Sequence, residues 1–132
     1  MRHDTKFCFR SDKGQSIVEF AIVLPVLVLL VFGIAQFGIA FRNYISITDA
    51  ARVGARAAAV KRTSNPCAAA STAIQNTVSA GQWSQISSRI TCVPGTNVGD
   101  QVSITINYPY SIGLPDLSVS GNLTANAKER ME

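Results

Sequence analysis

An acidic side chain lies within a long apolar run near the start of this chain. The run extends from Ile17 to Ile34, and its acid, Glu19, follows Gly14 by five residues. A carboxylate at the bilayer centre costs on the order of 2.5 to 3.5 kcal/mol, less near an edge, so such residues usually have a partner. This pattern favours ion pairing by Glu19. The structural alternative is that Glu19 is protonated, or that its side chain extends back to the membrane surface.

Three cysteines are the next candidates for chemistry. Cys8 precedes the apolar run, whereas Cys67 and Cys92 follow it. If the later part of the chain is exported, it lies where disulfides persist, and the odd count then resolves into one pair and one free thiol. A Cys67–Cys92 bridge would contribute roughly 3 kcal/mol by restricting the unfolded chain. The alternative is two unpaired, buried cysteines. No CxxC motif or histidine partner indicates a metal site or redox catalysis.

The remaining polar residues do not predict an enzyme. The single histidine, His3, lies ahead of the apolar run. The acids of the part expected to be exported show no spacing that pairs them for acid–base catalysis: Asp49, Asp100, Asp116, Glu129 and Glu132. A serine hydrolase needs a base and a metal site needs ligands, so we expect no catalytic residue, no metal and no cofactor.

Length and charge indicate a single-pass membrane protein with one small domain. The chain has 132 residues, of which 47% are hydrophobic and 15% charged. Basic residues outnumber acids ahead of the apolar run, which favours a cytoplasmic N-terminus and export of everything after Phe41. The sequence therefore predicts a cytoplasmic leader over residues 1–14, a transmembrane helix over residues 15–41 and an exported domain over residues 42–132.

A basic patch after the membrane run does not predict nucleic-acid binding. The patch comprises Arg52, Arg56, Lys61 and Arg62. No stacking aromatics are interleaved with these residues, and no nucleic-acid-binding motif surrounds them. A solvated face, or one that meets lipid headgroups, is the favoured interpretation.

The apolar helix is expected to continue outward through Val60. Its polar residues recur at intervals of three and four and form one stripe: Arg42, Ser46, Asp49, Arg52 and Arg56. The opposite side carries Phe41, Ile45 and small residues four apart, namely Ala50, Gly54 and Ala58 beside Ala51, Ala55 and Ala59. Small residues at this spacing allow close approach of another element. An alanine-rich helix is also simply a good helix.

A second, short helix has a recognisable start. Asn65 can cap it, and Pro66 suits its first turn because the missing amide hydrogen has no partner there. Its apolar face would be Cys67, Ala70, Ile74 and Val78. Gly81 is expected to stop this helix.

Beyond Trp83 the apolar period changes to two, which predicts strands. We expect strands over Ser88–Val93, Gln101–Tyr108 and Leu117–Lys128, with Gly121 as a possible bulge. The segments PGTNVGD and YPYSIGLPD are expected to form the turns between them. Three antiparallel strands need a cover for their apolar face, and the outer half of the long helix is the obvious candidate. The fold class predicted is α+β.

The segment GQSIVEFAIVLPVLVLLVFGIAQFG, residues 14–38, resembles the N-terminus of TadE-like proteins. These are minor pilins or pseudopilins of bacterial tight-adherence (Flp-type) pilus systems. The glycine, glutamate, phenylalanine, alanine and Leu-Pro positions carry the resemblance. It extends more loosely through DAARVGARAAA and the C-terminal LTANAKERME. The resemblance implies a pilin-like plan, with a long N-terminal helix and a small antiparallel sheet.

The resemblance also implies roles for individual residues. A prepilin peptidase would cleave between Gly14 and Gln15, and Glu19 would become the fifth residue of the mature chain. It would then pair with the N-terminal amine of a neighbouring subunit. Phe20 stands where Flp-type major pilins usually carry tyrosine. Pro25 would kink the helix, or allow it to bend or melt in a filament, and a kink in a lone anchor is equally compatible.

The function expected from the sequence is a structural component of a pilus. Its expected partners are other pilins or pseudopilins, pilus assembly membrane proteins, the prepilin peptidase and the lipid bilayer. Its expected location is the bacterial cytoplasmic membrane, with incorporation into a surface pilus as a further possibility. One alternative is a surface binding module, either membrane-anchored or released by signal peptidase after Gly33-Ile34-Ala35. A membrane-anchored enzyme is the third class and lacks candidate catalytic residues.

Overall fold

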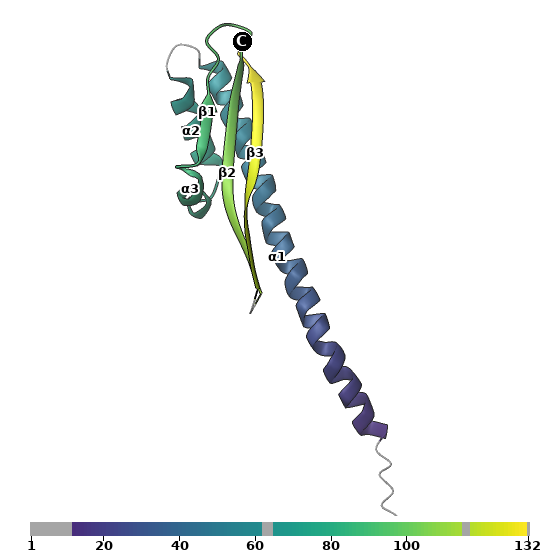
Figure 1. Ribbon diagram of the computed structural model, residues 1–132. Coiled ribbons are helices and arrows are strands. Elements are labelled where there is room, and N and C mark those ends of the chain that lie inside the picture. The colour runs from purple at the N-terminus through teal and green to yellow at the C-terminus, as the bar shows by residue number, and fades with distance from the viewer. Residues whose placement is uncertain (1–11, 62–64, 115–116, 132) are drawn as a thin grey trace, which may run out of the picture. The chain divides into compact units, whose positions relative to one another are not determined.

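The structure is a computed structural model that describes residues 12–61, 65–114 and 117–131. The expected leader, including His3 and Cys8, therefore lies largely outside the described residues. The chain divides into two compact units, Met1–Phe37 and Gly38–Glu132. The elements, in chain order, are helices α1 (Asp12–Val60), α2 (Pro66–Thr77) and α3 (Ala80–Ile86) and strands β1 (Ile90–Val93), β2 (Gln101–Leu114) and β3 (Leu117–Arg130) (Figure 1).

Helix α1 is one continuous helix of 49 residues that contributes to both units. It begins at Asp12, three residues before the expected start at Gln15. It is long and apolar enough to cross a membrane, and none of the residues in its most apolar stretch is buried. The expected candidate membrane span is therefore present.

Helix α2 starts as the sequence predicts. The side chain of Asn65 caps it by accepting a hydrogen bond from the Ala68 amide at 3.2 Å, and Pro66 occupies the first turn. Asn65 adopts a left-handed backbone conformation with φ of 39°. The helix ends at Thr77, and the amide of Val78 still donates to the carbonyl of Ile74 at 3.1 Å.

Helix α3 was not predicted, and the expectation that Gly81 stops a helix is wrong. Gly81 lies inside α3. Ser79 caps this helix, because its hydroxyl accepts from the Gln82 amide while the Gln82 side chain accepts from the Ser79 amide. This reciprocal capping box starts a new helix directly after α2.

The sheet has three antiparallel strands in the order β1-β2-β3, so the α+β, pilin-like fold is confirmed. Strand β2 continues to Leu114, beyond the expected end at Tyr108, and most of YPYSIGLPD is therefore strand and not turn. Pro109 is tolerated because β1 pairs only with Ser103–Ile106, so no third strand needs its missing amide hydrogen.

Gly121 is not a bulge. Strands β2 and β3 pair one to one from Gln101 opposite Arg130 to Leu114 opposite Leu117, with Gly121 opposite Tyr110. A Cβ atom on Gly121 would lie 2.8 Å from Cε1 of Tyr110. The glycine therefore makes room for the tyrosine ring of the neighbouring strand.

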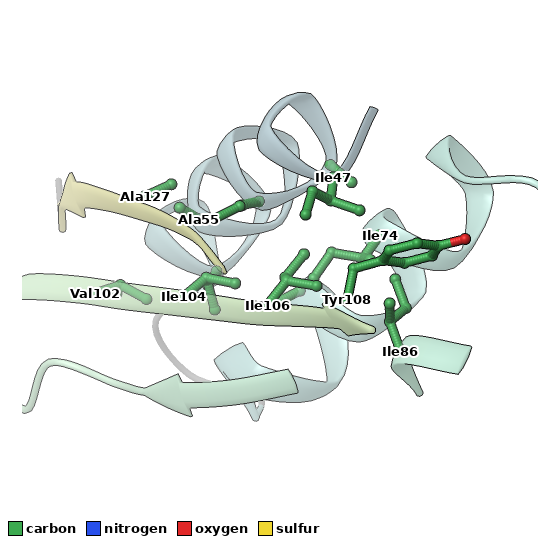
Figure 2. Close-up of a cluster of buried hydrophobic side chains, with 14 of the residues drawn as sticks. Ile47, Ala55, Ile74, Ile86, Val102, Ile104, Ile106, Tyr108 and Ala127 are labelled. Atoms are coloured by element: carbon green, nitrogen blue, oxygen red, sulfur yellow. The ribbon is translucent and has the colours of Figure 1, made fainter. Parts of the chain in front are cut away.

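The hydrophobic core of the second unit lies between the outer half of α1, the short helices and one face of the sheet (Figure 2). Alternate residues of β2 enter it, namely Val102, Ile104, Ile106 and Tyr108, as the period of two predicts. The small residues of α1 meet them, since Ala50, Ala51, Ala55 and Ala58 are fully buried. The predicted small-residue face of this helix is therefore its packing face.

The larger residues expected on that face of α1 do not join the core. Phe41 and Ile45 remain 65% and 46% exposed, and Ile47 is the large buried residue instead. A stripe through Ile47, Ala51, Ala55 and Ala58 follows the helical repeat, and Phe41 and Ile45 lie to the side of it.

Candidate assembly segment and disulfide

Gly14, Gln15, Glu19 and Phe20 all lie in the first turns of α1. Gln15 and Glu19 are one turn apart, and Nε2 of Gln15 donates a hydrogen bond to Oε1 of Glu19 at 3.3 Å. Both side chains are exposed. In the full-length chain, the side-chain amide of Gln15 thus lies within hydrogen-bonding distance of the Glu19 carboxylate. The carboxylate is exposed and therefore remains accessible to a further partner.

The helix surface around Glu19 is apolar and exposed. Phe20 is 60% exposed, and every large hydrophobic residue from Ile17 to Val31 exposes at least 43% of its surface. Exposed apolar surface of this extent marks a segment that meets lipid or other proteins. The acid is thus the polar exception on a helix face that requires an apolar environment.

Pro25 lies inside α1 and does not end it. Proline has no amide hydrogen, so the carbonyl four residues earlier, that of Ala21, receives no helical hydrogen bond from this position. The helix is therefore weaker here than in its neighbouring turns. The kink expected at Pro25 stays a prediction.

A disulfide joins Cys67 of α2 to Cys92 of β1, with the Cα atoms 5.8 Å apart and a sequence separation of 25. Cys92 lies on the inward side of β1 with Ile90, and both are partly buried against the core. The bridge therefore fastens α2 to the edge of the sheet. Closing a loop of this length in the unfolded chain stabilises the fold by about 3 kcal/mol.

A polar cluster between α3 and α1 was missed by the sequence reasoning. Gln82 accepts a hydrogen bond from the Ser46 hydroxyl at 3.2 Å and donates one to Oδ1 of Asn43 at 3.2 Å. The same side chain completes the capping box with Ser79. The spacing of Ser79 and Gln82 was the available signal. One glutamine thus starts α3 and fastens it to α1.

The loop between β1 and β2 is organised by Asp100. Its Oδ2 accepts from the amide and hydroxyl of Thr96, each at 3.0 Å, and from the amide of Asn97 at 2.8 Å. The amide hydrogen bond from Asn97, followed by the hydroxyl of Thr96, lowers the pKa of Asp100 below its ordinary value of 3.8. The backbone of Asp100 also accepts from the Met131 amide at 2.9 Å, so this turn holds the end of β3.

The described surface offers little for catalysis. No group of three or more His, Cys, Asp or Glu side chains that could hold a metal occurs among the described residues. An open groove of about 800 Å³ lies between α1 and α2, and several alanines line it, with the charged side chains of Arg56 and Lys61. Its lining contains no acid, histidine or cysteine. The groove therefore lacks the groups for acid–base or thiol chemistry.

Fold and site together define a class: an apolar helix suited to membrane anchoring, continuous with a disulfide-bridged, pilin-like α+β domain. The family model described as TadE-like protein matches residues 14–56, which confirms the resemblance over this segment. The match includes Gly14, Glu19 and Pro25. A comparison with curated proteins finds no match, and neither does a comparison with solved structures.

The matched segment suggests a coarse role for this protein. TadE-like proteins are a structural, pilus-associated family, which suggests a Tad pilus-associated protein with pilus components as partners. The apolar part of α1 is consistent with membrane anchoring.

Proposed function

We propose that this protein is a minor pilin or pseudopilin of a tight-adherence pilus. The observation that carries the proposal is Glu19, an exposed acid on an exposed apolar helix, within the segment that matches the TadE-like family. A buried carboxylate without a partner is costly, whereas one beside an ammonium group is no longer an unpaired charge. The N-terminal amine of a neighbouring subunit would supply that ammonium group.

The proposal assigns Gly14 and Gln15 to prepilin peptidase cleavage. Removal of residues 1–14 would leave Gln15 as the mature N-terminus and Glu19 as its fifth residue. Residues 15–41 would then span the cytoplasmic membrane, and residues 42–132 would form the exported domain. Phe20 would flank the pairing acid, and Pro25 would let the helix bend as the subunit enters an assembly.

Intact-mass and N-terminal analysis of the protein from its native membrane tests the cleavage. A mature N-terminus at Gln15 is expected. An N-terminus at Gln36 would contradict the proposal in favour of ordinary secretion, and an intact leader would leave the membrane anchor without pilin-type processing.

Charge reversal at Glu19 tests the pairing. Glu19→Lys is expected to abolish assembly and function, because two ammonium groups would then face one another. Glu19→Gln is expected to fail as well, since it retains hydrogen bonding but loses the charge. Asp49→Lys reverses an exposed acid on the same helix and is the matched control, expected to assemble normally. Normal assembly of Glu19→Lys would show that the pairing role is wrong.

A further inference from the structure

The β2–β3 hairpin extends well beyond the core of its domain. Strand β1 pairs only with Ser103–Ile106, and Tyr108 is the last buried residue of β2 among those described. Six further residues of β2, Pro109–Leu114, pair with Leu117–Asn122 of β3. At about 3.3 Å per residue, this distal part is roughly 20 Å long. A two-stranded ribbon of this kind is marginally stable in water and gains from a surface to lie on.

One face of the distal hairpin is apolar. The strand period continues the inward side of the sheet through Tyr110, Ile112 and Val119, and Ile112 pairs directly with Val119. Val119 is 51% exposed. The opposite face carries small and polar residues: Pro109, Ser111, Gly113, Ser118, Ser120 and Asn122. We call the side with Tyr110, Ile112 and Val119 the hairpin face.

The hairpin extends toward the end of its unit at which α1 enters that unit. At the opposite end, Glu129 and Arg130 of β3 line a small hollow together with Arg56, Ala59 and Val60 of α1. Farther along, Tyr108 of β2 and Ile47 of α1 share the core (Figure 2). Strand β2 therefore runs antiparallel to the part of α1 in the same unit, and its later residues lie toward the earlier residues of that part (Figure 1).

This end of the unit is also the end attached to the candidate membrane span. The apolar run ends at Ile34, four residues before Gly38, within the same continuous helix. Ile39, Phe41 and Tyr44 follow at once and remain 63%, 65% and 42% exposed. Tyr44 lies just beyond the proposed span over residues 15–41, and tyrosine is typical of the interface between lipid and water.

The charge pattern of the hairpin favours lipid as its neighbour. Among the described residues from Gln101 to Ala127 there is no Lys, Arg, Asp or Glu, while Lys128, Glu129 and Arg130 follow at the opposite end. The one charged residue of this stretch in the sequence, Asp116, lies outside the described residues. Moving Tyr110, Ile112 and Val119 toward lipid therefore desolvates no charged side chain among the described residues of the hairpin.

We propose that the hairpin face docks onto the headgroup–acyl boundary of the membrane that α1 enters, as a second, interfacial contact beside the helical anchor. The inference rests on the proposed membrane anchoring of α1 and not on the pilus role. Ile112 and Val119 would enter the boundary, with Tyr110 near the water side. Ser111, Ser120 and Asn122 would face away from the lipid.

Spin labels on the two faces of β3 test the proposal. Val119→Cys carries a label on the hairpin face, and Ser120→Cys is the matched control on the opposite face of the same strand. Both are made in the full-length chain with Cys8→Ser, which leaves the Cys67–Cys92 bridge intact. The protein is reconstituted in vesicles of phosphatidylethanolamine and phosphatidylglycerol. Oxygen, which concentrates in lipid, and a water-soluble nickel chelate then report the surroundings of each label.

The expected result is high oxygen access and low nickel access at residue 119, with the reverse at residue 120. Ile112→Cys, which lies opposite Val119, should behave like Val119→Cys. High nickel access at both faces would place the hairpin in water and overturn the proposal. Low access to both reagents at residue 119 would indicate a protein neighbour, such as another subunit, and would overturn it equally.

Flotation of the same vesicles shows whether the protein is anchored in the membrane at all. It therefore distinguishes loss of the hairpin contact from loss of membrane anchoring. Protein that floats with the vesicles but shows water at residue 119 retains the anchor and loses the hairpin contact. Protein that does not float contradicts membrane anchoring itself, and with it the proposed hairpin contact. Circular dichroism and non-reducing electrophoresis establish that each labelled variant is folded and bridged. Because Val119 is half exposed, its replacement leaves the core intact.

Discussion

Gly54 of α1 and Ile74 of α2 lie so close together that residue 54 has no room for a side chain. A Cβ atom at Gly54 would lie 2.7 Å from Cγ1 and 2.8 Å from Cδ1 of Ile74. Both residues are buried, and Ile74 is one of the largest fully buried side chains. The glycine thus sets how closely the two helices approach.

Gly54→Ala is therefore expected to destabilise the domain by about 1–3 kcal/mol, because an added methyl group overpacks this contact. Thermal unfolding of the full-length protein in detergent, followed by circular dichroism, measures the effect. Gly81→Ala is the matched control: no atom lies within 4 Å of its added methyl group. In helix α3 this change should be neutral or stabilise by about 0.4–1 kcal/mol. Equal stability of the two variants would contradict the close packing at Gly54.

The sequence predicted the small-residue face of α1 because the four-residue spacing of alanine and glycine directly encodes a helix face. It did not predict which residues lie at the centre of that face. Phe41 and Ile45 were assigned to the same side, but the sheet covers the stripe through Ile47. The direction of a helix face relative to a sheet depends on tertiary packing, for which the pattern of α1 carries no information.

Loss of the disulfide should lower the free energy of unfolding by the same amount whichever cysteine is removed. Cys67→Ser, Cys92→Ser and the double variant each open the same loop, so each should lower the free energy of unfolding by about 3 kcal/mol. Chemical denaturation of the full-length protein in detergent measures it, and reduction of the unaltered protein should reproduce the same loss. A double variant as stable as the bridged protein would contradict this role of the bridge.

Gln82→Ala should weaken the attachment of α3 to α1. The change removes the hydrogen bonds to Ser46 and Asn43 as well as half of the capping box. A loss of about 1–2 kcal/mol is expected, measured by thermal unfolding.

Gln85→Ala is the control for this change, since Gln85 is an exposed residue of the same helix. Its effect should stay within about 0.5 kcal/mol. If Gln82→Ala and Gln85→Ala lower the stability by the same amount, helix propensity and not the polar cluster explains the result.

Stability should fall at low pH through Asp100. Its pKa is lower in the folded protein than in the unfolded chain, so its contribution is present above the unfolded-state value and is lost as the pH falls through the folded value. Asp100→Asn should flatten the acid limb of a stability-against-pH curve, and NMR titration should place the carboxyl below 3.8. An Asp100 titration at or above that value would contradict the loop geometry.

The other differences between the sequence predictions and the structure have local causes, which the sequence patterns do not reveal. Ser79 and Gln82 start a new helix within two residues of the end of α2, so Gly81 lies inside α3 and does not act as the predicted stop signal. Proline and glycine in YPYSIGLPD indicated a turn, but residue-by-residue pairing with β3 extends the strand through Pro109. Cross-strand pairing outweighed the turn propensity of single residues there.

The loop closed by Cys67 and Cys92 contains α2, α3 and the start of β1, and excludes α1. A mechanical load on the part of α1 in the second unit passes into the packing of Ala51, Ala55 and Ala58. The covalent bridge cannot carry this load, because α1 lies outside the loop. We therefore expect resistance to a pull on α1 to depend on shear between its small side chains and the sheet, and we expect the bridged part of the domain to unravel last.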